Sequence, residues 1–166
     1  MSVVPSEPTV LNTTAPSNFA YIDQMELLET LPRVCTVPEV QSELRAGIES
    51  YPYLQRALDS LGDAIPVIAL DESVDEAARE LETRLDPGEA QAFAVADIYD
   101  GTLVTDDGPA RALARDTDVS VTGSIGVLIR AVDNNQISEA EADQWLKQWM
   151  DETDYRAPSR NLSDYR

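Results

Sequence analysis

The stretch from Leu103 to Ala114, "LVTDDGPARALA", joins a short apolar run to two adjacent aspartates, Asp106 and Asp107, and then to a helix-like segment. An apolar, β-branched run that gives way to an amphipathic segment is typical of a strand followed by a crossover helix. Ligands of open α/β sheets bind at the carboxyl ends of the strands, so the two aspartates mark a candidate site. Like charges this close repel each other, and either solvent screens them or a cation lies between them.

Outward from this stretch, short apolar runs alternate with longer amphipathic segments. This alternation predicts parallel strands joined by crossover helices, and therefore an α/β domain. We expect strands near Thr9–Leu11, Val34–Val37, Val67–Leu70, Leu103–Thr105 and Val119–Thr122. The expected helices are Asn18–Leu31, Pro38–Ile48, Tyr51–Leu61, Val74–Leu85, Pro87–Tyr99, Gly108–Asp116, Ser124–Asn134 and Ser138–Met150.

The length of 166 residues suits one ordinary domain with a single core. We expect a flexible N-terminal arm over residues 1–8, the domain over residues 9–150 and a polar C-terminal tail over residues 151–166. Ser138 and Glu141 have the spacing of a capping box, which predicts the start of the last helix.

Acidic residues dominate the charge, because 31 Asp and Glu against 12 Lys and Arg give a net charge of -19, while 43% of the residues are hydrophobic. A normal apolar content argues against disorder, and the acidic surface predicts a halophilic source. Strong negative charge ordinarily opposes nucleic-acid binding. In molar salt the Debye length is only about 3 Å, so local contacts decide and an RNA substrate is not excluded.

The reactive side chains are of few kinds. The chain has no histidine and a single cysteine, Cys35, which excludes Ser-His-Asp triads, histidine-ligated or multi-cysteine zinc sites and internal disulfides. Cys35 lies in "RVCTV" and is expected to be a buried strand thiol. No apolar run approaches the roughly 20 residues of a membrane-spanning helix, and the N-terminus lacks a signal-peptide pattern, so we expect a cytoplasmic protein without membrane contact.

Oxygen-bearing side chains follow two of the expected strands. At the end of the first strand the sequence reads "LNTTAPSN" (residues 11–18), which includes Asn12 and Ser17. The fourth strand is followed by Asp106 and Asp107. If these strands are close in the sheet, the oxygens converge on one cleft suited to Mg²⁺ or Mn²⁺. For Asp107 the alternative is an N-cap of the following helix, which leaves Asp106 harder to explain without a cation.

Further charged residues lie on expected helices. Glu43 and Glu89 are acids of the kind that usually belong to a solvated face or, in a first turn, are favoured by the helix dipole. Arg111 and Arg115 are four residues apart and share a helix face that begins at the aspartates, within reach of phosphates. The alternative for each arginine is a salt bridge to the acidic surface. The glycines of "TGSIGVL" suit a tight strand-to-helix entry with Ser124 as a cap.

Together these segments resemble PIN-like nucleases, and within them the group related to VapC-type toxin ribonucleases whose members open with an Asn-Thr-Ser-Pro type segment. The stretches that carry the resemblance are "VLNTTAPSNFAYIDQMELLETL", "VPEVQSEL", "LDPGEAQAFAVA" and "LVTDDGPARALARDTDVSVTGSIGVLIRAVDNNQIS", in this order over Val10–Ser138. The combination depends on apolar and glycine positions as well as acids, so the acidic composition does not account for it.

The resemblance implies a three-layer α/β/α domain with a central parallel sheet of about five strands, an acidic pocket that binds Mg²⁺ or Mn²⁺, and hydrolysis of RNA phosphodiester bonds. It implies a catalytic set of Glu43, Glu89, Asp106 and Asp107, and a metal-ligand set of Asn12, Glu89 and Asp106. Asn12 stands where most active PIN nucleases carry aspartate. Asparagine keeps an oxygen ligand but loses a charge, which lowers the expected metal affinity.

The expected partners are nucleic acid and protein. Contacts to nucleic acid are expected from Arg111, Arg115, Ser17 and Ser124. The resemblance also implies an antitoxin partner and a homodimer. The helix expected over residues 18–31 favours the dimer, because it carries more apolar side chains than one core-facing stripe needs. These side chains are Phe19, Tyr21, Ile22, Met25, Leu27 and Leu28. A helix buried on all sides is the alternative.

Two other functions are compatible with parts of the pattern. The first is a catalytically weak or inactive PIN-like module that binds RNA or a protein partner, which Asn12 and the low basic content favour. The second is a phosphoacceptor domain of the response-regulator kind, which also uses paired aspartates after a parallel strand. The aspartate pair here follows a late strand, and Lys147 lies on the last helix rather than after a strand, so the receiver ranks well below the other two.

Overall fold

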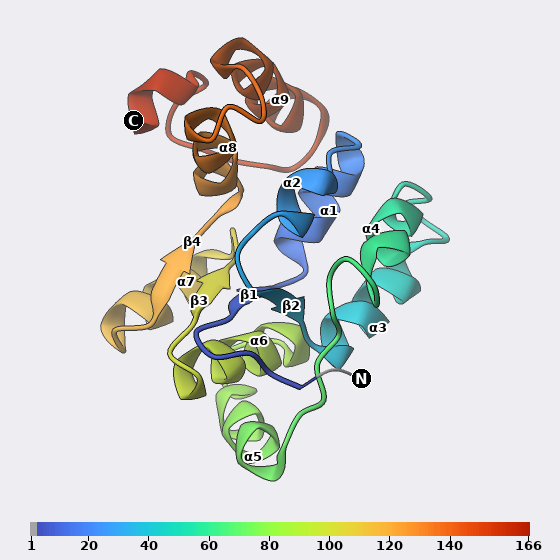
Figure 1. Cartoon of the computed structure of the whole chain (residues 1–166), viewed down its shortest axis with the longest axis vertical. Helices are drawn as coiled ribbons and strands as arrows, with labels where there is room; N and C mark the ends of the chain where they lie inside the picture. The colour runs from blue at the N-terminus through green and yellow to red at the C-terminus, as the bar shows by residue number, and fades with distance from the viewer. Residues whose placement is uncertain (1–2) are drawn as a thin grey trace.

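The centre of the structure is an all-parallel sheet of four strands in the order β2-β1-β3-β4 (Figure 1). It is seen in a computed structural model that describes residues 3–166, so the first two residues of the expected arm lie outside the described residues. The strands are β1 (Thr9–Leu11), β2 (Val34–Thr36), β3 (Thr102–Val104) and β4 (Ser120–Thr122). All residues of β1 and β2 are buried, as in parallel strands covered on both faces, and Cys35 is confirmed as a buried strand thiol.

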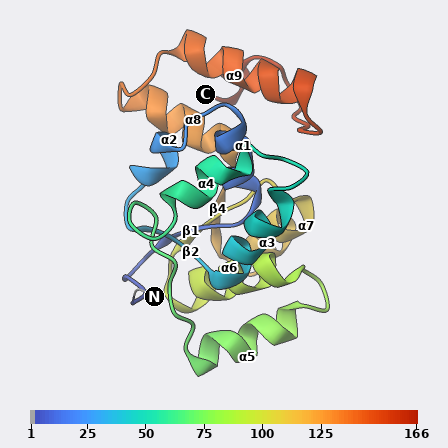
Figure 2. The same cartoon turned by 90° about the vertical axis from the view of Figure 1, so that its right-hand side faces the viewer.

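Helices flank the sheet on both sides, which confirms the α/β fold with its layered arrangement. Helices α5 and α6 lie on one side, and α1, α8 and α9 lie on the other (Figures 1 and 2). The helices are α1 (Thr14–Tyr21), α2 (Glu26–Glu29), α3 (Pro38–Gly47), α4 (Leu54–Ser60), α5 (Glu72–Leu81), α6 (Pro87–Ile98), α7 (Gly108–Asp116), α8 (Ser124–Asp133), α9 (Glu139–Glu152) and the 3-10 helix η1 (Leu162–Tyr165). The predicted capping box of Ser138 and Glu141 is present at the start of α9.

Two expected elements differ from the structure. The fifth strand, near Val67–Leu70, is reduced to a single parallel bridge between Thr36 and Val67 at the edge beside β2. The pairing stops there because Asp71 already caps α5 a few residues later, accepting a hydrogen bond from the Val74 N–H. The single helix expected over residues 18–31 is divided into α1 and α2, with Asp23 in the left-handed region at φ 56° between them.

The side chains that favoured a homodimer are used inside the chain. Phe19, Ile22, Met25, Leu27 and Leu28 are buried, so the alternative of a buried segment holds for these five. Phe19 packs edge-on against Trp149 of α9, with ring centroids 5.2 Å apart. The homodimer therefore stays a prediction without this support.

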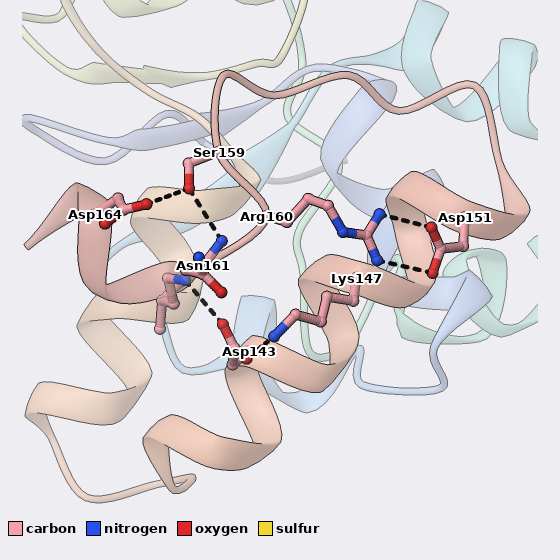
Figure 3. A network of polar contacts seen from close by, with 8 residues as sticks. Asp143, Lys147, Asp151, Ser159, Arg160, Asn161 and Asp164 are labelled. Carbon is pink, nitrogen blue, oxygen red and sulfur yellow. Dashed lines mark hydrogen bonds and ion pairs between the residues drawn. The ribbon is translucent and has the colours of Figure 1, made fainter.

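The C-terminal segment folds back along α9 rather than leaving the domain. Arg160 makes two hydrogen bonds to Asp151, at 2.6 and 3.0 Å, and the Leu162 N–H donates to Asp143 at 2.9 Å (Figure 3). Leu162 is fully buried. The segment expected as a polar tail is therefore anchored to α9. Among residues 3–166, none of the helices combines the length and the apolar composition needed to cross a membrane.

Candidate active site

The carboxyl ends of β1 and β3 meet because these strands are neighbours in the sheet. The Asn12 side-chain N–H donates to the Thr105 hydroxyl at 2.9 Å, and the Asp106 N–H donates to the Thr14 hydroxyl at 2.9 Å. The Asp107 N–H also donates to the Thr105 hydroxyl, at 3.1 Å. Residues expected from two separate strand ends are therefore joined in one hydrogen-bonded cluster.

Asn12 is buried, with 1% of its surface exposed, and its two amide atoms differ in their partners. The amide nitrogen is satisfied by Thr105, whereas Oδ1 has no hydrogen-bond partner among the described residues. Buried polar atoms are ordinarily paired, so an orphaned carbonyl oxygen is a feature that requires an explanation. It is free to accept from a water or a ligand, or to coordinate a cation.

Glu43 reaches the same strand ends from α3. Its carboxylate accepts hydrogen bonds from the Thr13 hydroxyl and, at 3.0 Å, from the Gly88 N–H in the first turn of α6. Partial burial raises the pKa of Glu43, and these two donors oppose the rise by stabilising the charged form. A Cβ at position 88 would lie 2.4 Å from Glu43 Oε1, so a glycine is required for this approach.

Glu89 is the most perturbed carboxyl of the cluster. Burial first, then a hydrogen bond to Asp86 and the charges of Asp86 and Asp107, raise its pKa to about 8. Asp86 is itself the N-cap of α6, and its carboxylate accepts from the Glu89 N–H at 2.8 Å. Asp107 caps α7 by accepting from the Ala110 N–H, so the N-cap that the sequence offered as the alternative for this residue is present. Asp86, Glu89 and Asp107 therefore crowd the starts of α6 and α7, and none of them forms an ion pair within residues 3–166.

Asp106 points to the other side of the strand end, toward α8. Its Oδ1 accepts from the Ser124 N–H at 2.8 Å, and its Oδ2 accepts from the Ser124 hydroxyl at 2.5 Å and from the Asn18 amide at 3.1 Å. The Tyr155 hydroxyl lies 3.5 Å from Oδ1. The Asp106 side chain therefore caps α8 from outside that helix. This contact explains the aspartate at position 106, which its neighbours in the sequence do not explain.

Ser124 has a different role from either one expected for it. The N-cap of α8 is Gly123, and Ser124 is the first helical residue. Ser124 is fully buried, so its hydroxyl holds Asp106 and does not face solvent. A Cβ at Gly123 would lie 2.7 Å from Asp106 Oδ1 and 2.8 Å from Arg111 Nη1, so the glycine allows both side chains to approach the start of α8.

A pocket of about 930 Å³ opens beside Asp106 and Asp107, between α1, α7, α8 and the C-terminal segment. Ser17, Arg111 and Arg115 line it, as their expected contacts to nucleic acid require. Arg111 is held in place by a hydrogen bond of 3.1 Å to the Thr105 carbonyl. Asn12, Glu43 and Glu89 are not part of the lining, whereas four of the residues bonded at the strand ends are: Thr13, Thr14, Asp106 and Asp107.

Two pocket residues, Tyr155 and Arg156, lie in the segment that the sequence marked as a tail. Burial, followed by the charge of Asp106, raises the pKa of Tyr155, so the hydroxyl remains a donor. No local motif could have found these residues. The only sequence signal is an aromatic residue next to an arginine in an otherwise acidic stretch, "DETDYRAP".

The comparison with family models gives one match, to a family described as a PIN domain, over residues 8–164. The chain belongs to the PIN domain family. This result confirms the family-level resemblance, and the match includes most of the expected tail. No curated protein and no solved structure matches the chain significantly. The finer resemblance to VapC-type toxins, and with it the antitoxin partner, stays a prediction, as do the halophilic source and the cytoplasmic location.

PIN domains are generally nucleases, and the divalent metal typical of them can be tested against the residues present. Within residues 3–166, no three or more His, Cys, Asp and Glu side chains come close enough together to hold a metal ion. Two observations nevertheless fit an oxygen-preferring cation: the orphaned Asn12 Oδ1 and the crowding that raises the pKa of Glu89. The oxygen groups of Asn12, Glu89 and Asp107 are of the kind that Mg²⁺ and Mn²⁺ prefer, whereas the Asp106 carboxylate already accepts from α1 and α8.

Proposed function

We propose that the protein is a metal-dependent ribonuclease that hydrolyses RNA phosphodiester bonds, with its centre at the adjoining ends of β1 and β3. The observation that carries the proposal is a series of oxygen groups beside a pocket lined by Arg111 and Arg115. Asn12 and Asp107 bond to the same Thr105 hydroxyl, and the charge of Asp107 acts on Glu89. PIN domain membership supports the nuclease class.

The cluster supplies the residues for a cation. Asn12 Oδ1, Glu89 and Asp107 would hold it, and Glu43, fixed by Thr13 and the Gly88 N–H, would orient a water from the side of α3. When bound, Mg²⁺ or Mn²⁺ supplies stabilisation of negative charge on the phosphate and a water activated at neutral pH, in a chain that has no histidine base.

The pocket supplies the residues for the substrate. Arg111 is anchored on the Thr105 carbonyl beside both aspartates, so its remaining N–H groups are directed toward a phosphate near the strand end. Arg115 lies one turn further along α7 and suits the next phosphate of the strand. Asp106 acts here as a positioning residue, because it fixes α8 and with it the pocket wall.

The proposal is tested with labelled single-stranded RNA in high KCl with Mn²⁺, Mg²⁺ or EDTA. Wild-type protein is expected to cleave with either metal and not with EDTA, and Glu89→Gln is expected to lose at least 100-fold of the rate, as typical of a lost electrostatic contribution at a reacting centre. The matched control is Glu80→Gln on α5, an exposed residue that should cleave like wild type. Cleavage that persists in EDTA and in Glu89→Gln would contradict the proposal.

The second candidate is a PIN domain that binds RNA or a protein without cutting. The neutral Asn12 and the saturated hydrogen bonding of Asp106 favour it. Retention of labelled RNA by wild-type protein in Mn²⁺, without any shortening of the strand, would support this function against the nuclease.

A further inference from the structure

The C-terminal segment closes one side of the pocket that contains Asp106. Residues 154–158 and Tyr165 all line this pocket, opposite Arg111 and Arg115 of α7. The segment begins directly after α9 and returns through η1, so a part of the chain far from the sheet in sequence reaches the strand ends. The segment contributes to the pocket lining, of which Glu89 is not a part.

The position of this segment is fixed by contacts at both ends. Before the pocket, the Tyr155 ring packs against Trp149, with ring centroids 5.3 Å apart, and its hydroxyl lies 3.5 Å from Asp106 Oδ1. After the pocket, Arg160 pairs with Asp151 and the buried Leu162 is held by Asp143 (Figure 3). The wall is therefore built into the fold.

Three arginines that form no ion pair within residues 3–166 lie together in the lining of this pocket. They are Arg111, Arg115 and Arg156. Only four of the 12 Lys and Arg residues form an ion pair within residues 3–166, so the notable feature is that three of the others lie together in one pocket. Asp106, Asp107 and Asp154 are acids of the same lining, and within residues 3–166 none of them forms an ion pair with these arginines.

The pocket also offers surfaces for bases. Tyr155 and Tyr165 are aromatic, and Ile125, Ile129 and Pro158 add apolar area beside the arginines. Arginines interleaved with aromatic side chains suit a single-stranded nucleic acid, because the guanidinium groups bind phosphates while bases pack on the rings. An acidic peptide would use the arginines but not the aromatic and apolar area.

We propose that Tyr155 and Arg156, together with Arg111 and Arg115, form a subsite that binds the nucleotides of single-stranded RNA next to the scissile phosphate. Arg156 binds a phosphate, and Tyr155 supplies the wall and positions Asp106. The inference rests on the proposed function for its substrate class, and it assigns a binding role to a segment outside the acidic cluster.

The test measures binding of a fluorescein-labelled single-stranded RNA by anisotropy, in EDTA, over a series of KCl concentrations. Arg156→Gln is expected to weaken binding about fivefold to tenfold and to lower the salt slope of the binding constant by about 0.7, the value for one lost contact to a single-strand phosphate. Arg111→Gln should behave similarly. Arg79→Gln, an exposed residue on α5 at the opposite end of the molecule, should bind like wild type (Figure 1).

The outcomes separate this inference from the proposed function. If Arg156→Gln keeps wild-type affinity and salt slope while Arg111→Gln does not, the C-terminal subsite is wrong and the nuclease proposal is unaffected. If a labelled oligoglutamate binds as tightly as RNA and loses the same affinity in Arg156→Gln, the site is a general anion site and the RNA assignment is overturned. If wild-type protein binds neither probe, both proposals fail. Loss of cleavage in Glu89→Gln with unchanged RNA binding supports the two roles as distinct.

Discussion

The Asp106 carboxylate accepts a hydrogen bond of 2.8 Å from the Ser124 N–H, so a residue in the loop after β3 caps the helix after β4. The two residues are 18 positions apart. Because β3 and β4 are paired, the loop that follows one strand lies beside the first turn of the helix that follows the other. Asp106 therefore links the strand end to the pocket wall, and substitutions at this position affect both stability and binding.

Removal of this cap should destabilise the fold. Asp106→Ala leaves the Ser124 N–H and hydroxyl without their acceptor, and loss of a helix cap costs about 0.5–2 kcal/mol of unfolding free energy. Asp106→Asn keeps one acceptor oxygen and should lose less. Urea unfolding measures both, with Asp97→Ala, an exposed residue of α6, as the control expected within about 0.5 kcal/mol of wild type. Equal stability of Asp106→Ala and wild type would show that the cap is unimportant.

Crowding at Glu89 should make the metal-free protein less stable at higher pH. The folded pKa is raised from 4.5 to about 8, so the stability contribution of Glu89 is complete below about pH 4.5 and is lost as the pH rises through about 8. Glu89→Gln does not titrate, so its stability relative to wild type should increase across this window. Thermal melts in EDTA at several pH values test it. Parallel curves for wild type and Glu89→Gln would rule out the crowding, and Glu80→Gln should remain parallel to wild type.

The close approach of Glu43 to α6 should make position 88 sensitive to a single methyl group. In Gly88→Ala the Cβ would lie within 3.0 Å of the Glu43 carboxylate. The carboxylate must therefore move away from Thr13 and the Gly88 N–H, at a cost of about 0.5–1.5 kcal/mol for each hydrogen bond lost. RNA cleavage should fall about tenfold to a hundredfold. For stability, the matched control is Gly108→Ala at the start of α7, where a Cβ meets nothing within 4 Å. It should be neutral or stabilising by up to about 1 kcal/mol. Equal stability of the two variants would contradict the close approach, and cleavage by Gly88→Ala at the wild-type rate would contradict a functional Glu43.

Local sequence chemistry predicted the features whose partners are close along the chain. The caps of α7 and α9 were predictable because Asp107 and Ser138 bond backbone groups three residues later. The strand runs were predictable from their apolar, β-branched character, and the convergence of Asn12 with the aspartates required only that β1 and β3 be neighbours.

The features that sequence reasoning missed depend on distant partners. The role of Asp106 depends on its hydrogen bonds with Ser124 and Asn18, and Asn18 is 88 residues away in the sequence. Tyr155 reaches Asp106 only because the C-terminal segment folds back along α9. The break between α1 and α2 lies at Asp23, whose left-handed backbone carries no glycine signal. The fifth strand is reduced to one bridge because α5 starts early, and the apolar pattern near Val67 does not predict that start.

The last prediction concerns Asn12, whose buried Oδ1 has no hydrogen-bond partner among residues 3–166. Asn12→Asp places a charge there, and Thr105 can reverse its role and donate its hydroxyl proton to the new carboxylate. In EDTA the variant should melt lower than wild type, because a buried charge at position 12 is poorly solvated and is repelled by Asp107, whose N–H bonds to the same Thr105 hydroxyl. Mn²⁺ should then raise its melting temperature more than that of wild type, since a charged oxygen holds a hard cation better than an amide and binding to the folded state stabilises it by mass action.

Asn134→Asp, at the exposed end of α8, adds the same charge as a control. A Mn²⁺-induced shift that is the same in wild type and Asn12→Asp would place Asn12 outside any metal site.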